Sequence, residues 1–210
     1  MTKKIPAPTV NRLSIYLACF SDLLASDVEY VSSEQMAKLA GLNPAQVRKD
    51  LAYFGKFGRR GYGYHVGQLK DRISKILGTN KAWKVGVIGA GNLGRALVMY
   101  GGFEERGFKI VAGFDADTDK TGWEINSVRI YHADELEEVI KKKKIEIIIL
   151  TTPKEALGPV ISRLKKTKIK GILNFAGKHL INDRDIIVRN VDLALEMEQL
   201  TFFLTNKPGG

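Results

Sequence analysis

The feature that most constrains the fold of this chain is a glycine-rich turn, Gly89-Ala90-Gly91-Asn92-Leu93-Gly94. A lone G-x-G-x-x-G pattern is weak evidence, but this one follows a short apolar run at 85–88, which is typical of a strand buried on both faces of a parallel sheet. It also opens an apolar-periodic helix. Asp115 stands 21 residues after Gly94, at the end of a second predicted strand. This context predicts a strand–turn–helix–strand unit at 84–115 that binds the pyrophosphate of an adenine dinucleotide.

Each residue of this motif has a physical role. Gly89 allows the tight turn, Gly91 lets the backbone approach the pyrophosphate, and Gly94 lets helix and strand pack closely. The helix N-terminus offers unpaired N–H groups and partial positive charge to the phosphates. Asp115 can accept hydrogen bonds from the ribose hydroxyls and would repel a 2′-phosphate, which favours NADH and NAD+ over the NADP pair. Lys120 nearby weakens that preference.

Further strands are predicted at 128–131, 145–150 and 171–175, with amphipathic helices between them. This alternation predicts a Rossmann-like, doubly wound parallel sheet in an α/β chain. Ligands bind at the carboxyl ends of such strands, so polar residues there are candidate nicotinamide contacts, although an ordinary loop role for Thr151 and Thr152 stays open. The predicted cofactor-binding residues are Gly89, Ala90, Gly91, Asn92, Leu93, Gly94, Asp115, Lys120, Thr151, Thr152, Pro153, Asn174 and Phe175.

The first eighty residues contain a different pattern. A first helix is predicted from apolar residues spaced by three and four, namely Val10, Leu13, Leu17, Phe20 and Leu24. Cys19, beside this stripe, is expected to be a packed thiol. A capping-box spacing at 32–35 begins a second helix that the glycine at 41 can close. Asparagine at 43, proline at 44 and glutamine at 46 give a second capping box and a third helix at 44–54. Together these predict a helix-turn-helix.

The third helix has two faces. Val47, Leu51 and Phe54 are expected to pack on the first two helices. Four other side chains suit contacts to phosphates and base edges, namely Gln46, Arg48, Lys49 and Tyr53. The segment 55–64 has four glycines, two arginines and three aromatic residues, which predicts a basic hairpin. A hairpin in this place is typical of the wing of a winged helix, although an ordinary hairpin with solvated arginines is the alternative. The predicted DNA-binding residues are Gln46, Arg48, Lys49, Tyr53, Lys56, Arg59, Arg60, Gly61 and Tyr62.

Composition supports an anionic partner. The chain has a formal net charge of +10, and between 43 and 65 five basic residues stand against Asp50 alone. A basic surplus favours partners such as nucleic acid. No apolar run approaches the ~18–20 residues of a membrane span. A single cysteine excludes an internal disulfide, which fits a cytoplasmic location.

Catalysis is not expected. A dehydrogenase needs a proton-transfer group and a substrate-binding wall, but only about 20 residues follow the predicted sheet, and His65, His132 and His179 form no recognisable catalytic spacing. No metal site is predicted. The apolar C-terminal segment 191–204 either returns to its own domain or, as we favour, forms a dimer interface. The predicted domains are a winged helix (1–78), a linker (79–83), a dinucleotide-binding domain (84–190) and a C-terminal dimerisation helix (191–206).

With these features together, the chain resembles the Rex family of redox-sensing transcriptional repressors. The resemblance covers nearly the whole length and is most specific at 48–55, 61–64, 89–94, 171–175 and 190–192. It implies a homodimer with a swapped C-terminal helix, which represses on palindromic operator DNA when NAD+ dominates and is released by NADH. It also implies switch roles for Tyr100, Asp192 and a basic residue of the first helix, Arg12 or a neighbour. Gly177 replaces the proline that is common in the family.

Two alternatives stay open from the residues themselves. One is a small NAD-dependent oxidoreductase whose basic N-terminal region forms a dimer. The other keeps the DNA-binding domain but senses a different adenine-containing ligand, such as coenzyme A, against which Asp115 argues modestly.

Overall fold

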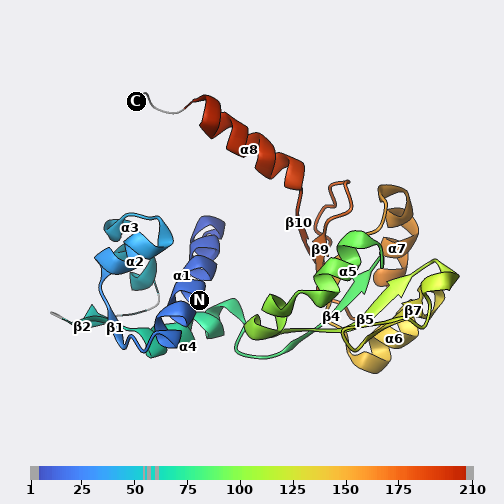
Figure 1. The fold of residues 1–210 in the computed structure, drawn as a ribbon, viewed down its shortest axis with the longest axis horizontal. Coiled ribbons are helices and arrows are strands. Elements are labelled where there is room, and N and C mark those ends of the chain that lie inside the picture. The colour runs from blue at the N-terminus through green and yellow to red at the C-terminus, as the bar shows by residue number, and fades with distance from the viewer. Residues whose placement is uncertain (1–4, 54, 56–57, 60–61, 207–210) are drawn as a thin grey trace. The chain divides into compact units, whose positions relative to one another are not determined.

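The computed structural model describes residues 5–53, 55, 58–59 and 62–206 of the chain. It divides into two compact units, Met1–Lys81 and Ala82–Gly210 (Figure 1). The finer domain boundaries given above stay a prediction.

The first unit is a helical domain with a small antiparallel sheet. Its sheet has the strand order β1-β3-β2, with Tyr30 opposite His65 and Gly58 opposite Tyr64. The hairpin after the third helix therefore forms as predicted. The elements are α1 (Ala7–Ala25), β1 (Tyr30–Val31), α2 (Ser33–Ala40), α3 (Pro44–Ala52), β2 (Gly58–Arg59), β3 (Gly63–His65) and α4 (Val66–Leu77).

Local capping explains where the short helices begin and end. The Ser32 hydroxyl accepts from the Gln35 backbone N–H, and the Gln35 side chain accepts from that of Ser32, so the predicted capping box is confirmed. Gly41 closes α2 at φ +64°, in the left-handed region that favours glycine. The second predicted capping box is wrong. Asn43 caps α3 alone, because the Gln46 side chain donates to the buried Asp50 carboxylate instead.

The core of this unit corrects the predicted stripe of the first helix. Leu13, Tyr16 and Phe20 are completely buried, whereas Val10 is 37% exposed. Tyr16 can be buried because its hydroxyl donates a hydrogen bond to Asp50. The spacing of apolar residues in the sequence does not reveal this hydrogen bond. Phe54, predicted to pack on the first two helices, lies outside the described residues.

The second unit is built on a seven-stranded sheet of order β10-β9-β8-β4-β5-β7-β6. All neighbouring strands are parallel except β6 and β7. The two strands that the sequence analysis missed, β6 and β10, are the edges, where partial exposure leaves a weak apolar signal. The strands are β4 (Trp83–Ile88), β5 (Phe108–Asp115), β6 (Glu124–Ile125), β7 (Val128–His132), β8 (Ile147–Leu150), β9 (Gly171–Asn174) and β10 (Ile187–Asn190).

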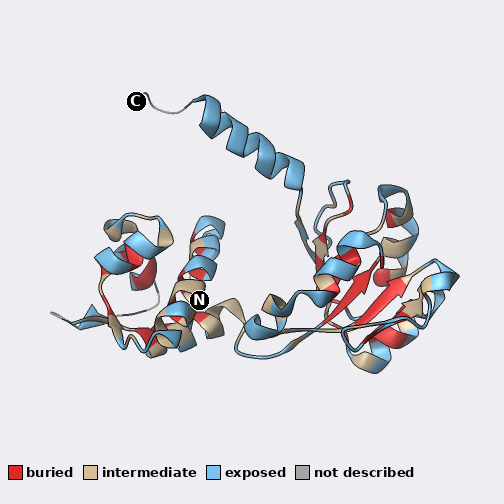
Figure 2. Cartoon of the chain, viewed as in Figure 1, coloured by how far each residue is buried: buried red, intermediate tan, exposed pale blue. Residues whose placement is uncertain are grey.

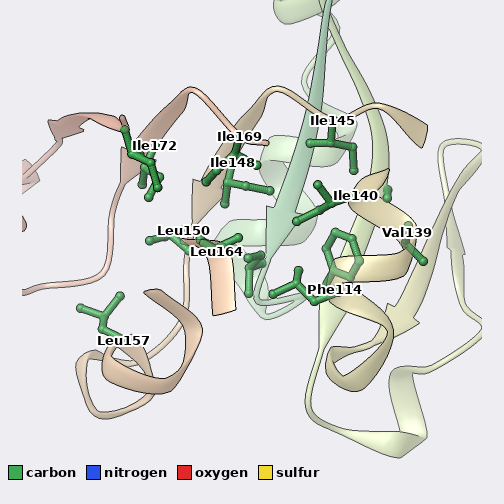
Figure 3. Close-up of a cluster of buried hydrophobic side chains, with 14 of the residues drawn as sticks. Phe114, Val139, Ile140, Ile145, Ile148, Leu150, Leu157, Leu164, Ile169 and Ile172 are labelled. Carbon is green, nitrogen blue, oxygen red and sulfur yellow. The ribbon is translucent and has the colours of Figure 1, made fainter. Parts of the chain in front are cut away.

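Helices cover both faces of this sheet. On one face α6 (Leu136–Lys143) and α7 (Leu157–Leu164) enclose the larger core, in which Phe114, Ile148 and Leu150 are fully buried (Figure 3). A second cluster, around Val85, Val87 and Val98, includes a residue of α5 (Asn92–Met99). This arrangement places the carboxyl ends of β4, β5 and β8 along one edge of the sheet, where the glycine-rich turn lies.

The C-terminal helix α8 (Leu193–Thr205) has no buried residue, and Figure 2 shows it exposed along its length. Its large apolar side chains are all at least half exposed: Leu193, Leu195, Met197, Leu200, Phe202, Phe203 and Leu204. Soluble monomers rarely expose such a contiguous apolar surface. The helix therefore has the character of an interface element.

Candidate dinucleotide site and DNA-binding surface

Two positions of the turn after β4 have room for no residue larger than glycine. Gly89 has φ +101°, and a Cβ there would lie 2.9 Å from the Thr151 carbonyl oxygen. A Cβ on Gly94 would lie 1.8 Å from the Gly89 carbonyl oxygen. Both glycines are therefore required by the close approach of α5 to the turn and to β8.

Gly91 has a different environment from the other two glycines of the turn. A Cβ on this residue would meet nothing within 4 Å, so protein packing does not select glycine here. Gly91 is the N-cap of α5, and no side chain caps this helix. The first turn of α5 therefore has no capping side chain, and the space around the Gly91 Cα is open. This cradle fits the pyrophosphate of a dinucleotide.

Asp115, at the end of β5, fixes the same turn. Its Oδ2 accepts from the Ala90 N–H at 2.7 Å, and its Oδ1 accepts from the Asp117 N–H at 2.9 Å. A carboxylate has about four acceptor positions, so Asp115 keeps capacity for ribose hydroxyls. The ligand contact of Asp115 stays a prediction from the sequence, whereas its hydrogen bond to Ala90, which fixes the turn, was not predicted.

Lys120 lies beside this carboxylate. Its Nζ is 3.5 Å from Asp115 and 3.1 Å from Asp117. Its hydrogen bond to Asp117 and the charges of both carboxylates raise the pKa of Lys120, which keeps it cationic. The ammonium group therefore offsets part of the negative charge that would repel a 2′-phosphate.

The two threonines after β8 differ in environment. The Thr151 hydroxyl is 2.8 Å from the Gly89 carbonyl oxygen and 3.1 Å from that of Ile88, so it supports the glycine turn. The Thr152 hydroxyl is buried and has no hydrogen-bond partner within the described part of the chain. Pro153 follows as the N-cap of a short 3-10 helix. Thr152 is thus the member of this loop with an unsatisfied polar atom.

Asn174, a predicted nicotinamide contact, is only 3% exposed. Its amide donates to the Lys178 carbonyl and to Asn190 Oδ1, and its Oδ1 accepts from the Ala176 N–H. These bonds show a role in shaping the loop after β9, while Phe175 is half-buried beside the smaller core. The role of Asn190 was not predicted, because the strand that carries it, β10, has only a weak apolar pattern.

The loop after Phe175 has Gly177 at the position where the family that the sequence resembles commonly has proline. Gly177 has φ +27°, whereas proline fixes φ near about −65°. Proline therefore does not fit the loop conformation of this chain.

The third helix presents basic side chains as predicted for a DNA-binding surface. Arg48 and Lys49 are exposed, as is Tyr53. The Arg48 guanidinium donates to the Ser33 hydroxyl at 2.9 Å and contacts Glu34, which holds it over the start of α2. Gln46, in contrast, is half-buried.

In the predicted wing, the Arg59 guanidinium lies 5.0 Å from the centre of the Tyr62 ring, a cation–π distance. Lys56, Arg60 and Gly61 lie outside the described residues.

Beneath α3 lies a buried carboxylate that the sequence analysis counted only as a charge. Asp50 is 1% exposed and accepts hydrogen bonds from Arg12, Tyr16 and Gln46. Burial alone would raise the pKa of Asp50, but these hydrogen bonds outweigh it and hold the pKa below its usual value. Burial and the neighbouring Asp50 raise the pKa of Tyr16, which keeps its hydroxyl protonated. Arg12, expected in a switch, is engaged here.

The other two predicted switch residues are at the surface. Tyr100 is 57% exposed, and its ring packs edge-on against Phe103 at 5.1 Å. Asp192 is the N-cap of α8, with Oδ1 accepting from the Ala194 N–H at 2.9 Å. Burial raises the pKa of the Cys19 thiol, as expected for a packed cysteine.

Two further features are absent from the described residues. No group of three or more His, Cys, Asp or Glu side chains there could hold a metal ion. Within the same part of the chain, no helix combines the length and apolar character needed to cross a membrane.

Two cavities lie in the second unit away from the glycine turn. One, of about 850 Å³, is lined by six lysines where β4, β8 and β9 begin, at the edge opposite the turn. The other, of about 540 Å³, is an apolar groove with Trp83, Phe108, Ile147 and Leu173 in its lining. The groove offers an uncovered apolar surface to a docking element.

Comparison with known families divides the chain in the same way. Residues 4–52 match the family described as a putative DNA-binding protein N-terminus. Residues 80–177 match the CoA binding domain family.

Relatives match over nearly the full length. The redox-sensing transcriptional repressor Rex of Carboxydothermus hydrogenoformans is 48% identical over 199 residues, which covers 95% of this chain and 96% of the relative. The Rex protein of Syntrophobacter fumaroxidans is 44% identical over 203 residues, with 96% and 97% covered.

Solved structures give the same fold. RSP, a Rex-family repressor, has a TM-score of 0.87 at 33% identity, covering 98% of this chain and 96% of that chain. RSP in complex with β-NAD+ and operator DNA has a TM-score of 0.85 at 34% identity, with 99% and 100% covered. RSP in complex with β-NADH has 0.87 at 32%, with 97% and 95% covered. The predicted N-terminal DNA-binding domain followed by a Rossmann-like sheet is confirmed.

Proposed function

The chain belongs to the Rex family of redox-sensing transcriptional repressors, and we propose that it binds palindromic operator DNA as a homodimer and leaves it when NADH binds. It is a repressor and not an enzyme. One observation carries the proposal: the same chain combines a winged helix with exposed basic residues and a glycine turn that fits a pyrophosphate. The RSP structures with β-NADH, β-NAD+ and operator DNA support it.

The ligand site extends along the carboxyl edge of the sheet. The α5 N-terminus and Gly91 receive the pyrophosphate, and Asp115 accepts from the adenosine ribose hydroxyls. Thr152 lies on the nicotinamide side, where its buried hydroxyl needs a partner. The nicotinamide ring of a bound dinucleotide would be either reduced or oxidised, and the protein distinguishes these two forms.

The dimer is proposed from the apolar helix α8. Its exposed face and the apolar groove around Trp83 and Leu173 are complementary in character. In a swapped arrangement, Asp192 at the start of α8 meets the partner subunit, and Tyr100 and Arg12 or a neighbour of Arg12 complete the switch. The domain boundaries after residues 78, 83 and 190 belong to this proposal, as does a cytoplasmic location, where NAD(H) and operator DNA are both available.

The mechanism is a shift between two dimer arrangements. In one arrangement the two α3 helices stand ~34–36 Å apart, the spacing of successive major grooves. In the other they are out of register. NADH drives the change only by binding the second arrangement more tightly, and operator DNA must then lower NADH affinity by the same factor.

A gel shift tests this proposal with a palindromic duplex selected by the protein from a random library. NADH, NAD+, NADPH and coenzyme A are titrated separately, because one matched family is described as CoA binding. We expect release by NADH at the lowest concentration. Release by coenzyme A alone, or an NADH affinity unchanged by the duplex, would contradict the proposal. Arg48→Ala and Lys49→Ala should weaken duplex binding and leave NADH affinity unchanged.

A further inference from the structure

The buried carboxylate of Asp50 connects α1 to the recognition helix α3. Among the described residues, Asp50 is the one charged residue that is buried. A buried carboxylate is unfavourable unless hydrogen bonds satisfy its oxygens. The bonds that satisfy Asp50 therefore hold a fixed arrangement between these two helices.

Four hydrogen bonds reach this carboxylate. Arg12 is bidentate, with Nε 2.5 Å from Oδ2 and Nη2 2.8 Å from Oδ1. The Tyr16 hydroxyl donates to Oδ2 at 3.0 Å. The Gln46 amide nitrogen donates to Oδ1 at 2.8 Å. Each oxygen thus accepts two bonds, and α1 supplies three of the four donors.

The carboxylate determines the orientation of the Gln46 amide. An ionised carboxylate only accepts hydrogen bonds, so the NH2 group of Gln46 must face it, and not the amide oxygen. One N–H and the carbonyl oxygen of the same amide are left over. When the N–H that bonds Asp50 is the one trans to the carbonyl oxygen, the remaining N–H lies on the same side of the amide as that oxygen, and this pair is the one with which glutamine forms a bidentate contact to adenine in the major groove.

The position of Gln46 also suits a base contact. It lies in the first turn of α3, since Pro44 is the first residue of that helix. Recognition helices contact base edges with their N-terminal residues. A side chain that is already held in one orientation loses less conformational entropy on binding than a free one.

We propose that Asp50 is a positioning residue for sequence recognition: it holds the Gln46 amide so that its remaining edge reads an adenine in each operator half-site. Arg12 and Tyr16 hold the carboxylate in turn. This inference rests on the proposed function, because it concerns the DNA that α3 contacts.

The first test measures which base pair depends on Gln46. Full-length protein is titrated with the selected duplex and with duplexes that change one base pair at a time. Gln46→Ala should lose roughly 5- to 150-fold of discrimination at one A·T pair per half-site, with discrimination at the other pairs unchanged. Discrimination retained at every pair would overturn the proposal.

The second test asks whether Asp50 acts through Gln46. Asp50→Asn should reduce discrimination at the same A·T pair, and the double variant should be no worse there than Gln46→Ala alone. Asp71→Asn, at an exposed position of α4, is the matched control and should keep the wild-type pattern. A merely structural Asp50 would instead lower affinity for all duplexes equally, which would overturn the proposal.

A third measurement needs no variant at Asp50, which matters if Asp50→Asn does not fold. The Gln46 side-chain amide of the free wild-type protein should be as rigid as ordered backbone, with an NMR order parameter near about 0.85. A value below about 0.6, typical of a mobile group, would overturn the assignment. A wild-type protein that binds its selected duplex but ignores NADH would contradict the proposed sensing function and leave the Asp50 assignment standing.

Discussion

Two aspartates illustrate how the same side chain serves different ends in the two units. Asp50 is 1% exposed, and each of its oxygens accepts two hydrogen bonds from the protein. The Asp115 side chain is 13% exposed and accepts from two backbone N–H groups, with Lys120 at its side. Asp50 has therefore used its acceptor capacity to fix a helix, whereas Asp115 fixes a turn and keeps capacity for a ligand. The two roles differ in the solvent exposure of the carboxylate and in the number of acceptor positions that it has left for a ligand.

Removing the Asp50 carboxylate should have the largest effect on stability. Asp50→Ala leaves the Arg12 charge and the Tyr16 hydroxyl without their acceptor, and breaking a buried pair costs about 3–5 kcal/mol. Urea unfolding followed by circular dichroism should show this loss in the first unit. Asp71→Ala, at an exposed position, should change the unfolding free energy by no more than about 0.5 kcal/mol. A loss of that smaller size for Asp50→Ala would mean that the network contributes little.

The contrast also shows which features the sequence could predict. The glycine turn and the Ser32 cap follow from local patterns, because a turn or a cap is determined within a few residues of its own position. Asp115 was predicted from a fixed spacing, since it ends the second strand of a strand–turn–helix–strand unit. Asp50 is bound by residues 34 and 38 positions away, and Thr151 supports a carbonyl 62 positions away. No local periodicity reports such pairs. They depend on how helices and strands pack, as does the Asn174–Asn190 contact.

Substitution of the second aspartate should change ligand binding more than stability. Asp115→Ala removes the predicted ribose acceptor and the bond to the Ala90 N–H, so NADH affinity should fall by roughly 10- to 100-fold. Binding of the selected duplex without NADH should be unchanged. Fluorescence titration of NADH measures the first effect, and a gel shift measures the second. The control is Asp119→Ala, at an exposed position in the same loop. If both variants bind NADH with the same affinity, Asp115 does not contribute to the binding site.

Lys120 offers a smaller and more selective way to sharpen the comparison. Lys120→Met removes the ammonium group that lies 3.5 Å from Asp115, so the carboxylate should repel a 2′-phosphate more strongly. NADPH affinity should fall by about 2- to 5-fold, in the range of a partly exposed ion pair, while NADH affinity stays nearly constant. Competition of each dinucleotide against bound NADH measures the ratio. A parallel loss of both affinities would show instead that Lys120 maintains the shape of the loop.

The mildest perturbation is a change of pH. The direction in which it changes the contribution of Asp50 to the free energy of unfolding can be predicted. Because its folded-state pKa is held below the usual value, the carboxylate binds protons less readily in the folded protein than in the unfolded chain. Its contribution to stability is therefore complete above the unfolded pKa of about 3.9 and is lost as the pH falls through the lower folded value. Asp50→Asn should flatten the acid limb of the stability curve in that window, and Asp71→Asn should not. An unchanged acid limb in Asp50→Asn would mean that another group dominates the acid unfolding of the first unit. The buried carboxylate would then position α3 without controlling its stability in acid.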